Sequence, residues 1–324
     1  MSTMRAYQWD GPGSNLVLKE LPVPEPGPGD VQIQIKACGL CHSDCHILDG
    51  TGAQWIKQRP ITLGHEISAQ ITKLGEGVTE FHVGQRVGCA LIAPATAIGL
   101  DFNGGYAEYA VAPAHVIVPL PDSLPYEKAC IAVDAMASAY HAVVGTGAVT
   151  SSMTVGVLGL GGLGSTGLAV ACLQGATVYG FDLNESKFPA ALAAGAKACH
   201  KSIDEVKDVT FDIVFDFVGI NATMLTAINA VKREGIIVLV GMGDNEMKLP
   251  SGLIVMKNIE IRGSLGGRKP ELPQIFELIA QGTLTPRVEE VPFESLVHSL
   301  HRLEQGKADA RMFGYLEQVN LAHL

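Results

Sequence analysis

No charged residue occurs between Ala142 and Phe181, and this stretch constrains the fold more than any other part of the sequence. By length and composition it would be able to cross a bilayer. Glycines interrupt it, however, at positions 145, 147, 156, 159, 161, 162, 164, 167, 175 and 180. Such interruptions divide an apolar run into short pieces, as in a parallel sheet that helices cover on both faces. We therefore expect buried strands and one helix here rather than a membrane span.

The middle of the chain alternates between two patterns. Short apolar runs typical of buried strands are separated by segments with helical character. The expected strands are residues 154–159, 177–182, 211–218 and 235–241, and the expected helices are 162–174, 185–194 and 222–232. A further strand at 259–265 and a helix around 273–281 follow. Strict alternation of this kind predicts parallel βαβ units and a doubly wound sheet.

The first third of the chain has a different, β-rich pattern. Val31, Ile33 and Ile35 alternate with polar residues, which is the period of a half-buried strand. Four prolines and two glycines between residues 22 and 29 indicate an extended turn region before it. Further short strands are expected at 67–74, 86–91 and 106–119. Together these features predict an irregular barrel.

Composition limits the partners and the compartment. The 324 residues correspond to roughly two domains at about 150 residues each. A net charge of −10 argues against nucleic-acid or anionic-membrane partners, because no net positive field attracts phosphate. Residues 1–11 contain no apolar signal segment, and an odd number of cysteines, seven, favours a reducing compartment. We therefore expect a cytoplasmic protein.

A glycine-rich motif follows the first expected strand of the middle region. Residues 159–164 read G-x-G-x-x-G, a pattern that binds a dinucleotide pyrophosphate at a helix N-terminus. Asp182 ends the next strand, where a carboxylate would bind ribose hydroxyls and repel a 2′-phosphate, which favours NAD over NADP. Lys187 either helps to hold the ribose or is a solvated helix charge. The alternative is a plain glycine turn and a surface aspartate. The expected cofactor-binding residues of this region are Gly159, Gly161, Gly162, Leu163, Gly164, Asp182 and Lys187.

A second constellation is rich in metal ligands. Cys41, His42, Asp44, Cys45 and His46 lie within six residues, and a Gly-His-Glu sequence follows at 64–66. Thiolate and imidazole are ligands that suit zinc, and a catalytic zinc needs three protein ligands and one open position. Spacing alone leaves two interpretations open, a metal site or core thiols beside a structural histidine.

Several segments together resemble the medium-chain zinc-dependent alcohol dehydrogenases. They are ACGLCHSDCH at 37–46, GHE at 64–66, GGYAEY at 104–109, DAMASAYHAV at 134–143, GLGGLG at 159–164, VGMG at 240–243 and GKADAR at 306–311. The resemblance covers nearly the whole chain and keeps the family's order. It implies an α/β architecture in which a GroES-like β-rich catalytic domain, residues 1–139 plus 266–324, holds an inserted Rossmann NAD-binding domain, residues 140–265.

The resemblance also implies a metal-ligand set. Cys41 and His65 match the first two catalytic zinc ligands. Asp134 falls where many members have a third cysteine and some have a carboxylate; its alternative is a hinge carboxylate without metal contact. Glu66 matches an acidic neighbour of the metal, and Asp44 matches a carboxylate that would orient His65.

Further matches concern the proton and the cofactor. Ser43 matches the hydroxyl that contacts the substrate oxygen, and His46 the outer end of a proton relay through the nicotinamide ribose. His42 and Arg311 match phosphate-binding positions, with an ordinary surface ion pair as the alternative for Arg311. The matches near the nicotinamide are Ser138 and the 240–243 backbone, including Val240 and Gly241.

Two departures from the family pattern matter. The turn at 84–87 is followed by Cys89 alone, where many members carry four cysteines around a structural zinc, so we expect one catalytic zinc only. The substrate pocket is not assigned by the match; its candidates are Trp55, Ile92, Tyr109 and Leu265.

The expected function is thus hydride transfer between NAD(H) and an alcohol or its ketone or aldehyde, in a homodimer or homotetramer. Two alternatives stay open at this point. One is a zinc-free reductase of the same superfamily that acts on activated C=C or C=N bonds. The other is a nucleotide-binding structural protein such as a recruited lens crystallin.

Overall fold

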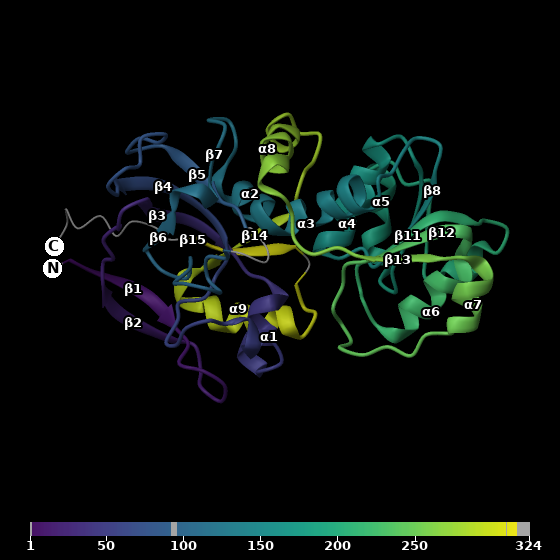
Figure 1. Ribbon diagram of the computed structural model, residues 1–324, viewed down its shortest axis with the longest axis horizontal. Helices are drawn as coiled ribbons and strands as arrows, with labels where there is room; N and C mark the ends of the chain where they lie inside the picture. The colour runs from purple at the N-terminus through teal and green to yellow at the C-terminus, as the bar shows by residue number, and fades with distance from the viewer. Residues whose placement is uncertain (1, 92–95, 309, 316–324) are drawn as a thin grey trace. The chain divides into compact units, whose positions relative to one another are not determined.

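The computed structural model describes residues 2–91, 96–308 and 310–315, which fall into two compact units (Figure 1). Residues up to Asp134 together with those from Arg268 onward form one unit, and Ala135–Gly267 form the other. The second unit is therefore inserted into the first. The sequence placed the two divisions after residues 139 and 265, whereas the compact units divide after 134 and 267.

The first unit is built around one long strand. β3 (Asp30–Gly39) pairs antiparallel with three strands, β4 (Glu66–Leu74), β6 (Tyr109–Pro113) and β15 (Arg311–Tyr315). The sheet runs in the order β14-β15-β3-β4-β5-β7, with β6 paired to β3, and a separate hairpin joins β1 and β2. The remaining strands are β1 (Thr3–Gln8), β2 (Val17–Pro22), β5 (Arg86–Cys89), β7 (Ile117–Pro119) and β14 (Val288–Pro292).

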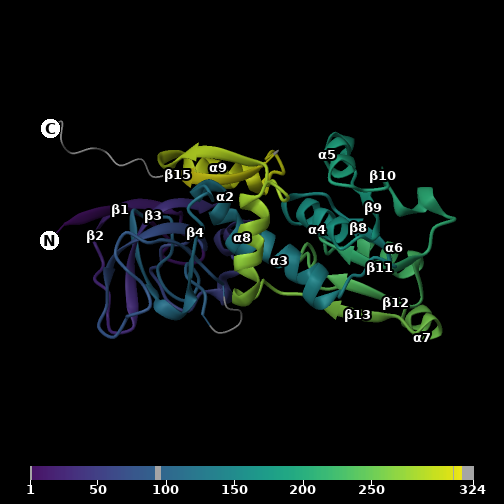
Figure 2. The ribbon, with the colours of Figure 1, turned by 90° about the horizontal axis from the view of Figure 1, so that it is seen from above.

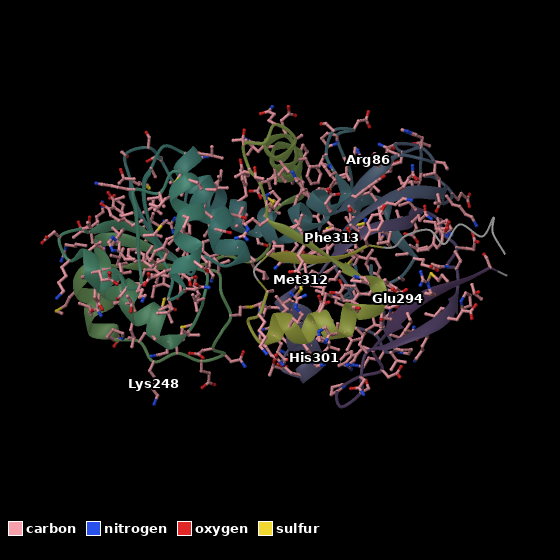
Figure 3. The ribbon with its side chains drawn as sticks, turned by 180° about the vertical axis from the view of Figure 1, so that it is seen from behind. Arg86, Lys248, Glu294, His301, Met312 and Phe313 are labelled. Carbon is pink, nitrogen blue, oxygen red and sulfur yellow. The ribbon has the colours of Figure 1, made fainter. Side chains whose placement is uncertain are left out.

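Four helices accompany this sheet, α1 (His42–Asp49), α2 (Tyr126–Ile131), α8 (Leu272–Ala280) and α9 (Leu296–Glu304). α9 lies beside β15 in both ribbon views (Figures 1 and 2). In Figure 3 the labelled Met312 lies on β15 next to α9, the helix that carries His301. Met312 belongs to the main core of the unit, together with Leu300 of α9 and Ile33 of β3. The core therefore ties the C-terminal strand and helix to the N-terminal sheet.

Two details of the β-rich prediction are wrong. The alternation in β3 predicts outward polar side chains, but Gln32 is buried. Its amide donates to the Pro24 carbonyl at 2.6 Å and its oxygen accepts from Thr72 at 2.6 Å, which satisfies both ends of the side chain. The expected strand 106–119 is instead two strands, β6 and β7, separated by a 3₁₀ turn at Ala114–Val116.

The second unit contains a parallel sheet of six strands in the order β10-β9-β8-β11-β12-β13. Its strands are β8 (Thr154–Leu158), β9 (Thr177–Phe181), β10 (Ala198–His200), β11 (Phe211–Asp216), β12 (Val231–Leu239) and β13 (Glu260–Gly263). The main helices are α3 (Ala137–Tyr140), α4 (Gly162–Leu173), α5 (Phe188–Ala193), α6 (Asn221–Ala230) and α7 (Ser251–Lys257). α4 and α5 lie on one side of the sheet, and α6 and α7 lie on the other (Figure 1). This is the predicted doubly wound arrangement.

The chain reverses its direction of travel across this sheet between β8 and β11. Leu158 and Asp216, the last residues of the two strands, are paired in register. In doubly wound sheets a ligand binds outside the carboxyl ends of the strands at such a reversal. The glycine motif that begins at Gly159 follows β8 directly and therefore lies at this position.

Within the described residues, one helical segment, Tyr126–Thr146, is long and apolar enough to cross a membrane by length and composition alone. In the structure 72% of its apolar window is buried within the protein, as in a core helix. The charge-free stretch that begins at Ala142 is divided among the end of this segment, β8, α4 and β9.

Candidate metal and cofactor sites

Four potential metal ligands, a thiol, an imidazole and two carboxylates, gather in the first unit. One ligand atom from each of Cys41, His65, Glu66 and Asp134 lies within 4.8 Å of the others. Cys41 precedes α1, and His65 precedes β4, whose first residue is Glu66. Asp134 lies in a π-helical turn after α2. Of the residues that the structure describes, only these four form such a group. Cys41, His65 and Asp134 are the three ligands that the family resemblance implied.

The register of two strands brings the group together. Gly39, the last residue of β3, pairs with Glu66, the first residue of β4, so the segments at these ends are neighbours. A side chain at Gly39 would clash with the Glu66 carboxylate, because its Cβ would lie 2.0 Å from Oε2. Gly64 adopts a φ of +91°, a left-handed conformation that glycine tolerates, and thereby turns the chain into His65.

His65 is held between two carboxylates. Its Nε2 lies 3.5 Å from Asp134 Oδ2, and its Nδ1 lies 3.5 Å from Asp44 Oδ1. Burial lowers the pKa of His65, but the carboxylates outweigh it and raise that pKa well above the usual value. The protein without a metal thus favours a positive charge at this point, which is the electrostatic property of a cation site.

Glu66 has its own counter-ion. Arg311 of β15 forms an ion pair with Glu66 Oε1, and the two side chains are only 10% and 0% exposed. Complete burial raises the pKa of the Glu66 carboxyl, and the Arg311 guanidinium opposes that shift. Arg311 is largely buried and its partner is a buried carboxylate, so the alternative of a surface ion pair is wrong. The phosphate role stays a prediction.

The residues fit a zinc ion. Tetrahedral zinc with bonds of 2.0–2.3 Å holds its ligands about 3.3–3.8 Å apart. His65 Nε2 and Asp134 Oδ2 are 3.5 Å apart, and all four ligand atoms lie within 4.8 Å of one another. Four buried polar atoms here have no hydrogen-bond partner among the described residues: Asp44 Oδ1, His65 Nδ1, Glu66 Oε2 and Arg311 Nε. Of these atoms only Glu66 Oε2 belongs to the ligand group, whereas Asp44 Oδ1 and His65 Nδ1 face each other at 3.5 Å as an ion pair, so the fit to zinc rests on the donor set. A thiolate, an imidazole and carboxylates are also the donor set of zinc rather than of magnesium or calcium.

The predicted relay residues lie on α1, beside this group. Ser43 Oγ is 3.6 Å from Cys41 Sγ. His46, one helical turn later, is 36% exposed, and its Nδ1 lies 3.2 Å from Thr51 Oγ1. The i, i+3 spacing places both side chains on one face of the helix. Burial and the nearby Arg311 charge lower the pKa of His42, which begins the helix.

The glycine motif of the second unit has the geometry of a phosphate cradle. Gly159 has a φ of +83°, which its turn requires. A Cβ at Gly164 would lie 1.7 Å from the Gly159 carbonyl oxygen, whereas one at Gly161 would meet nothing within 4 Å. The space in front of Gly161 is open, and the first N–H groups of α4, from Gly162 onward, have no intrahelical partner there. These are the properties that an incoming phosphate uses.

Asp182 follows β9 and organises this turn. Its Oδ2 accepts from the Leu160 amide at 2.7 Å and from Lys187 Nζ at 2.8 Å, and its Oδ1 accepts from the Asn184 amide at 2.8 Å. Burial raises the pKa of Asp182, but these donors outweigh it and lower the pKa below the usual value. Lys187 forms an ion pair with Asp182. Its contact with the ribose stays a prediction.

The other predicted cofactor residues of this unit lie in two places. The amides of Val240 and Gly241 donate to the Asp216 carbonyl at 2.9 and 3.0 Å, which anchors the turn after β12 at the carboxyl edge of the sheet. Ser138 lies in α3 and is buried. Asp216 itself was not singled out from the sequence. Its buried carboxylate accepts from Val218, Gly219 and Thr223, so it shapes the loop beside the glycine motif.

The pocket candidates are scattered. The ring of Trp55 lies 6.2 Å from that of His46, edge to face. Tyr109 lines a cavity of about 500 Å³ beside the β1–β2 hairpin. None of the four potential metal ligands lines this cavity. Leu265 is 61% exposed. Ile92 lies outside the described residues.

Comparisons with known proteins decide the family. Residues 27–122 match the alcohol dehydrogenase GroES-like domain, and residues 162–281 match the zinc-binding dehydrogenase domain. An alcohol dehydrogenase of Geobacillus stearothermophilus is 30% identical over 331 residues, which cover 92% of this chain and 95% of the relative. The chain belongs to the medium-chain zinc-dependent alcohol dehydrogenase family.

Solved structures of this family have the same fold. The acetophenone reductase of Geotrichum candidum, solved in complex with NAD, has a TM-score of 0.88 at 28% identity and covers 98% of both chains. A cobalt- and zinc-bound thermostable alcohol dehydrogenase of Pyrobaculum aerophilum has a TM-score of 0.86 at 26% identity, over 97% of this chain and 100% of its own. The predicted GroES-like and Rossmann architecture and the predicted oxidoreductase class are thereby confirmed.

Proposed function

We propose that this medium-chain dehydrogenase transfers a hydride between NAD(H) and a small alcohol or its ketone or aldehyde, with a zinc ion and a proton relay in the first unit. The observation that carries the proposal is the group of Cys41, His65 and Asp134, with Ser43 beside the thiol, 3.6 Å from its sulfur. A zinc-free reductase would have no use for that group, and a structural protein would not need the relay.

Cys41, His65 and Asp134 would hold the zinc, and Glu66 would lie behind them, neutralised by Arg311. When bound, zinc supplies Lewis-acid polarisation of the substrate oxygen. The protein's own contribution is a fixed ligand set. His65 is immobilised between Asp44 and Asp134, and Cys41 is fixed at the N-terminus of α1. Ligands held in this way bind without first losing side-chain freedom.

Ser43 and His46 would move the proton. The Ser43 hydroxyl both donates and accepts, so it is suited to pass a proton from the substrate oxygen. His46 is partly exposed and can therefore exchange protons with solvent, and imidazole is the side chain that most readily gives and takes a proton near neutral pH. Alcohol oxidation would send the proton outward along this pair, and carbonyl reduction would bring it inward.

The second unit would bind the cofactor, and NAD supplies the hydride acceptor. The open space at Gly161 and the N-terminus of α4 would receive the pyrophosphate. The Asp182 carboxylate, kept charged by its lowered pKa, would accept from a ribose hydroxyl and repel a 2′-phosphate, so we propose NAD rather than NADP. His42, Ser138, Val240, Gly241 and Arg311 complete the proposed cofactor contacts.

We propose one zinc per chain, because Cys89 is the only cysteine between residues 84 and 100. We also propose a homodimer or homotetramer. β13 is an edge strand of its sheet, and Ile261 within it is 39% exposed. The unpaired backbone groups of an edge strand are able to pair with another chain. Light scattering coupled to gel filtration measures the mass; a monomer at working concentration would contradict this part.

The function is tested by following NADH and NADPH consumption with ketones, aldehydes, imines and activated alkenes. We expect turnover of ketones or aldehydes with NADH, about one zinc per chain by elemental analysis, and loss of both in Cys41→Ser. Cys89→Ser is the matched control, because Cys89 is also a buried thiol of the first unit but belongs to the hydrophobic core. Turnover of alkenes or imines by zinc-free protein would establish the alternative reductase instead.

A further inference from the structure

A tyrosine outside the ligand set contacts the metal site from behind. Tyr106, in the segment between β5 and β6, is fully buried. Its hydroxyl donates to Asp44 Oδ2 at 2.7 Å, with a longer contact of 3.4 Å to the Gly39 carbonyl. An O–H donated to a carboxylate at this distance is a strong, charge-assisted hydrogen bond. Tyr106 belongs to the GGYAEY sequence at 104–109 and is not one of the proposed ligand or relay residues.

The backbone fixes the direction of the tyrosine ring. Residues 104–106 run along residues 62–64, joined by hydrogen bonds from Gly104 to Thr62 at 2.7 Å, from Gly105 to Gly64 at 2.7 Å and from Tyr106 to Leu63 at 3.0 Å. The ring packs directly on Gly64, where an added Cβ would lie 2.6 Å from the ring carbon Cδ1. Because Gly64 precedes His65, the tyrosine is tied to the same turn that presents a proposed zinc ligand.

Asp44 connects the tyrosine to two of the proposed ligands. The oxygen that accepts from Tyr106, Oδ2, also lies 3.3 Å from the amide nitrogen of Cys41. The other oxygen, Oδ1, faces His65 Nδ1 at 3.5 Å. Asp44 is completely buried, so each of its oxygens depends on protein donors. One carboxylate therefore sets the position of Cys41 through its backbone and of His65 through its ring.

We propose that Tyr106 is a positioning residue of the metal site, whose hydroxyl fixes the Asp44 carboxylate and through it the placement of Cys41 and His65. The inference rests on the proposed zinc site and deepens it. When Tyr106 donates to Oδ2, the carboxylate is held with Oδ2 toward the Cys41 amide and Oδ1 toward the His65 ring. Without the hydroxyl, Asp44 gains freedom to rotate, and both ligands lose the group that orients them.

The test measures zinc binding by the metal-free protein in competition with a chromogenic chelator. Partners that orient a metal ligand are worth about 10–100-fold in metal affinity, and Tyr106 acts one step further out, so we expect Tyr106→Phe to weaken zinc binding about tenfold. Tyr7→Phe is the matched control. Tyr7 is also buried in this unit and donates one hydrogen bond, to the Glu294 carbonyl at 3.1 Å, and we expect wild-type zinc affinity for it.

A double-mutant cycle separates positioning from a general loss of stability. Asp44→Asn places an amide donor toward His65 Nδ1 and should weaken zinc binding more than Tyr106→Phe does, up to about a hundredfold. Because Tyr106 acts through Asp44, adding Tyr106→Phe to Asp44→Asn should weaken binding no further. The d–d absorption of cobalt-substituted protein should change in Tyr106→Phe and stay unchanged in Tyr7→Phe.

The outcomes are distinct. Failure of the wild-type chain to bind zinc would overturn the proposed function itself. Zinc binding by the wild type with equal affinity in Tyr106→Phe would overturn only the role of Tyr106, as would fully additive losses in the double variant. If Tyr106→Phe does not fold, the Asp44→Asn variant still decides: unchanged zinc affinity there removes the link through which Tyr106 would act.

Discussion

The glycine motif allows a prediction that separates packing from cofactor binding. In Gly164→Ala the new methyl group would lie 1.7 Å from the Gly159 carbonyl oxygen. An ordinary carbon–oxygen contact is about 3.2–3.4 Å, so the turn and the start of α4 must separate by roughly 1.5 Å. Both atoms belong to the backbone or are attached to it directly, so no side-chain rotation relieves the clash. We expect a loss of about 1–3 kcal/mol in the free energy of unfolding.

Gly161→Ala should behave in the opposite way. Its Cβ would meet nothing within 4 Å, and its φ of −74° suits alanine, so the cofactor-free protein should keep its stability. The methyl group would stand where the proposed pyrophosphate approaches. We expect NADH binding to weaken at least tenfold, or about 1.4 kcal/mol.

The assay pairs urea unfolding of the cofactor-free protein with titration of NADH fluorescence. Gly252→Ala serves as the control, because its Cβ also meets nothing within 4 Å and it lies in α7, away from the motif. It should leave both quantities near wild type. Wild-type NADH affinity in Gly161→Ala, or wild-type stability in Gly164→Ala, would refute the assignment of these two glycines.

Further predictions concern charge and proton transfer. Asp182→Ala should weaken NADH binding and improve NADPH binding in fluorescence titrations, because the carboxylate no longer repels a 2′-phosphate; an unchanged preference would contradict the proposed cofactor choice. Folding lowers the pKa of Asp182 from 3.8, so the charged carboxylate stabilises the folded protein fully above pH 3.8. This stabilisation is lost as the pH falls through the pKa of the folded state. The difference in the free energy of unfolding between wild type and Asp182→Asn should therefore shrink below about pH 4. Arg311→Ala should lower the free energy of unfolding in urea by about 3–5 kcal/mol, because it leaves Glu66 buried without its counter-ion. A loss below about 1 kcal/mol, as for a surface ion pair, would contradict a buried pair. His46→Gln should lower alcohol turnover about 10²-fold in steady-state assays, and added imidazole should restore part of the lost turnover. Wild-type turnover in this variant would show that His46 is not part of the relay.

Periodicity predicted five of the six strands of the parallel sheet, missing the short β10 (Ala198–His200), but described the β-rich unit less well. In the second unit, buried strands and glycine turns follow one another in a local pattern that the sequence displays directly. In the first unit, Gln32 breaks the alternation of β3 because Pro24, in the turn region before the strand, and Thr72, distant along the chain, satisfy its amide. Such long-range partners leave no local signal. The break between β6 and β7 has the same origin, since β6 pairs with β3 and β7 with β5.

The candidate site was predicted unevenly for a similar reason. Cys41 and His65 belong to dense local motifs, but Asp134 was reached only through the family resemblance, because its proximity depends on how α2 packs. Tyr106 was missed, although it lies in a motif that had been noticed, because its hydroxyl acts through another side chain. The Arg311 partner was missed because Glu66 is far away in the sequence.

The central claim is a zinc ion held by Cys41, His65 and Asp134, and a crystal structure of zinc-supplemented protein with anomalous data at the zinc edge tests it most directly. We predict one anomalous peak per chain, bonded to Cys41 Sγ, His65 Nε2 and an Asp134 carboxylate oxygen at 2.0–2.3 Å. A peak elsewhere, or none at this group in protein that turns over a ketone or aldehyde with NADH, would contradict the account.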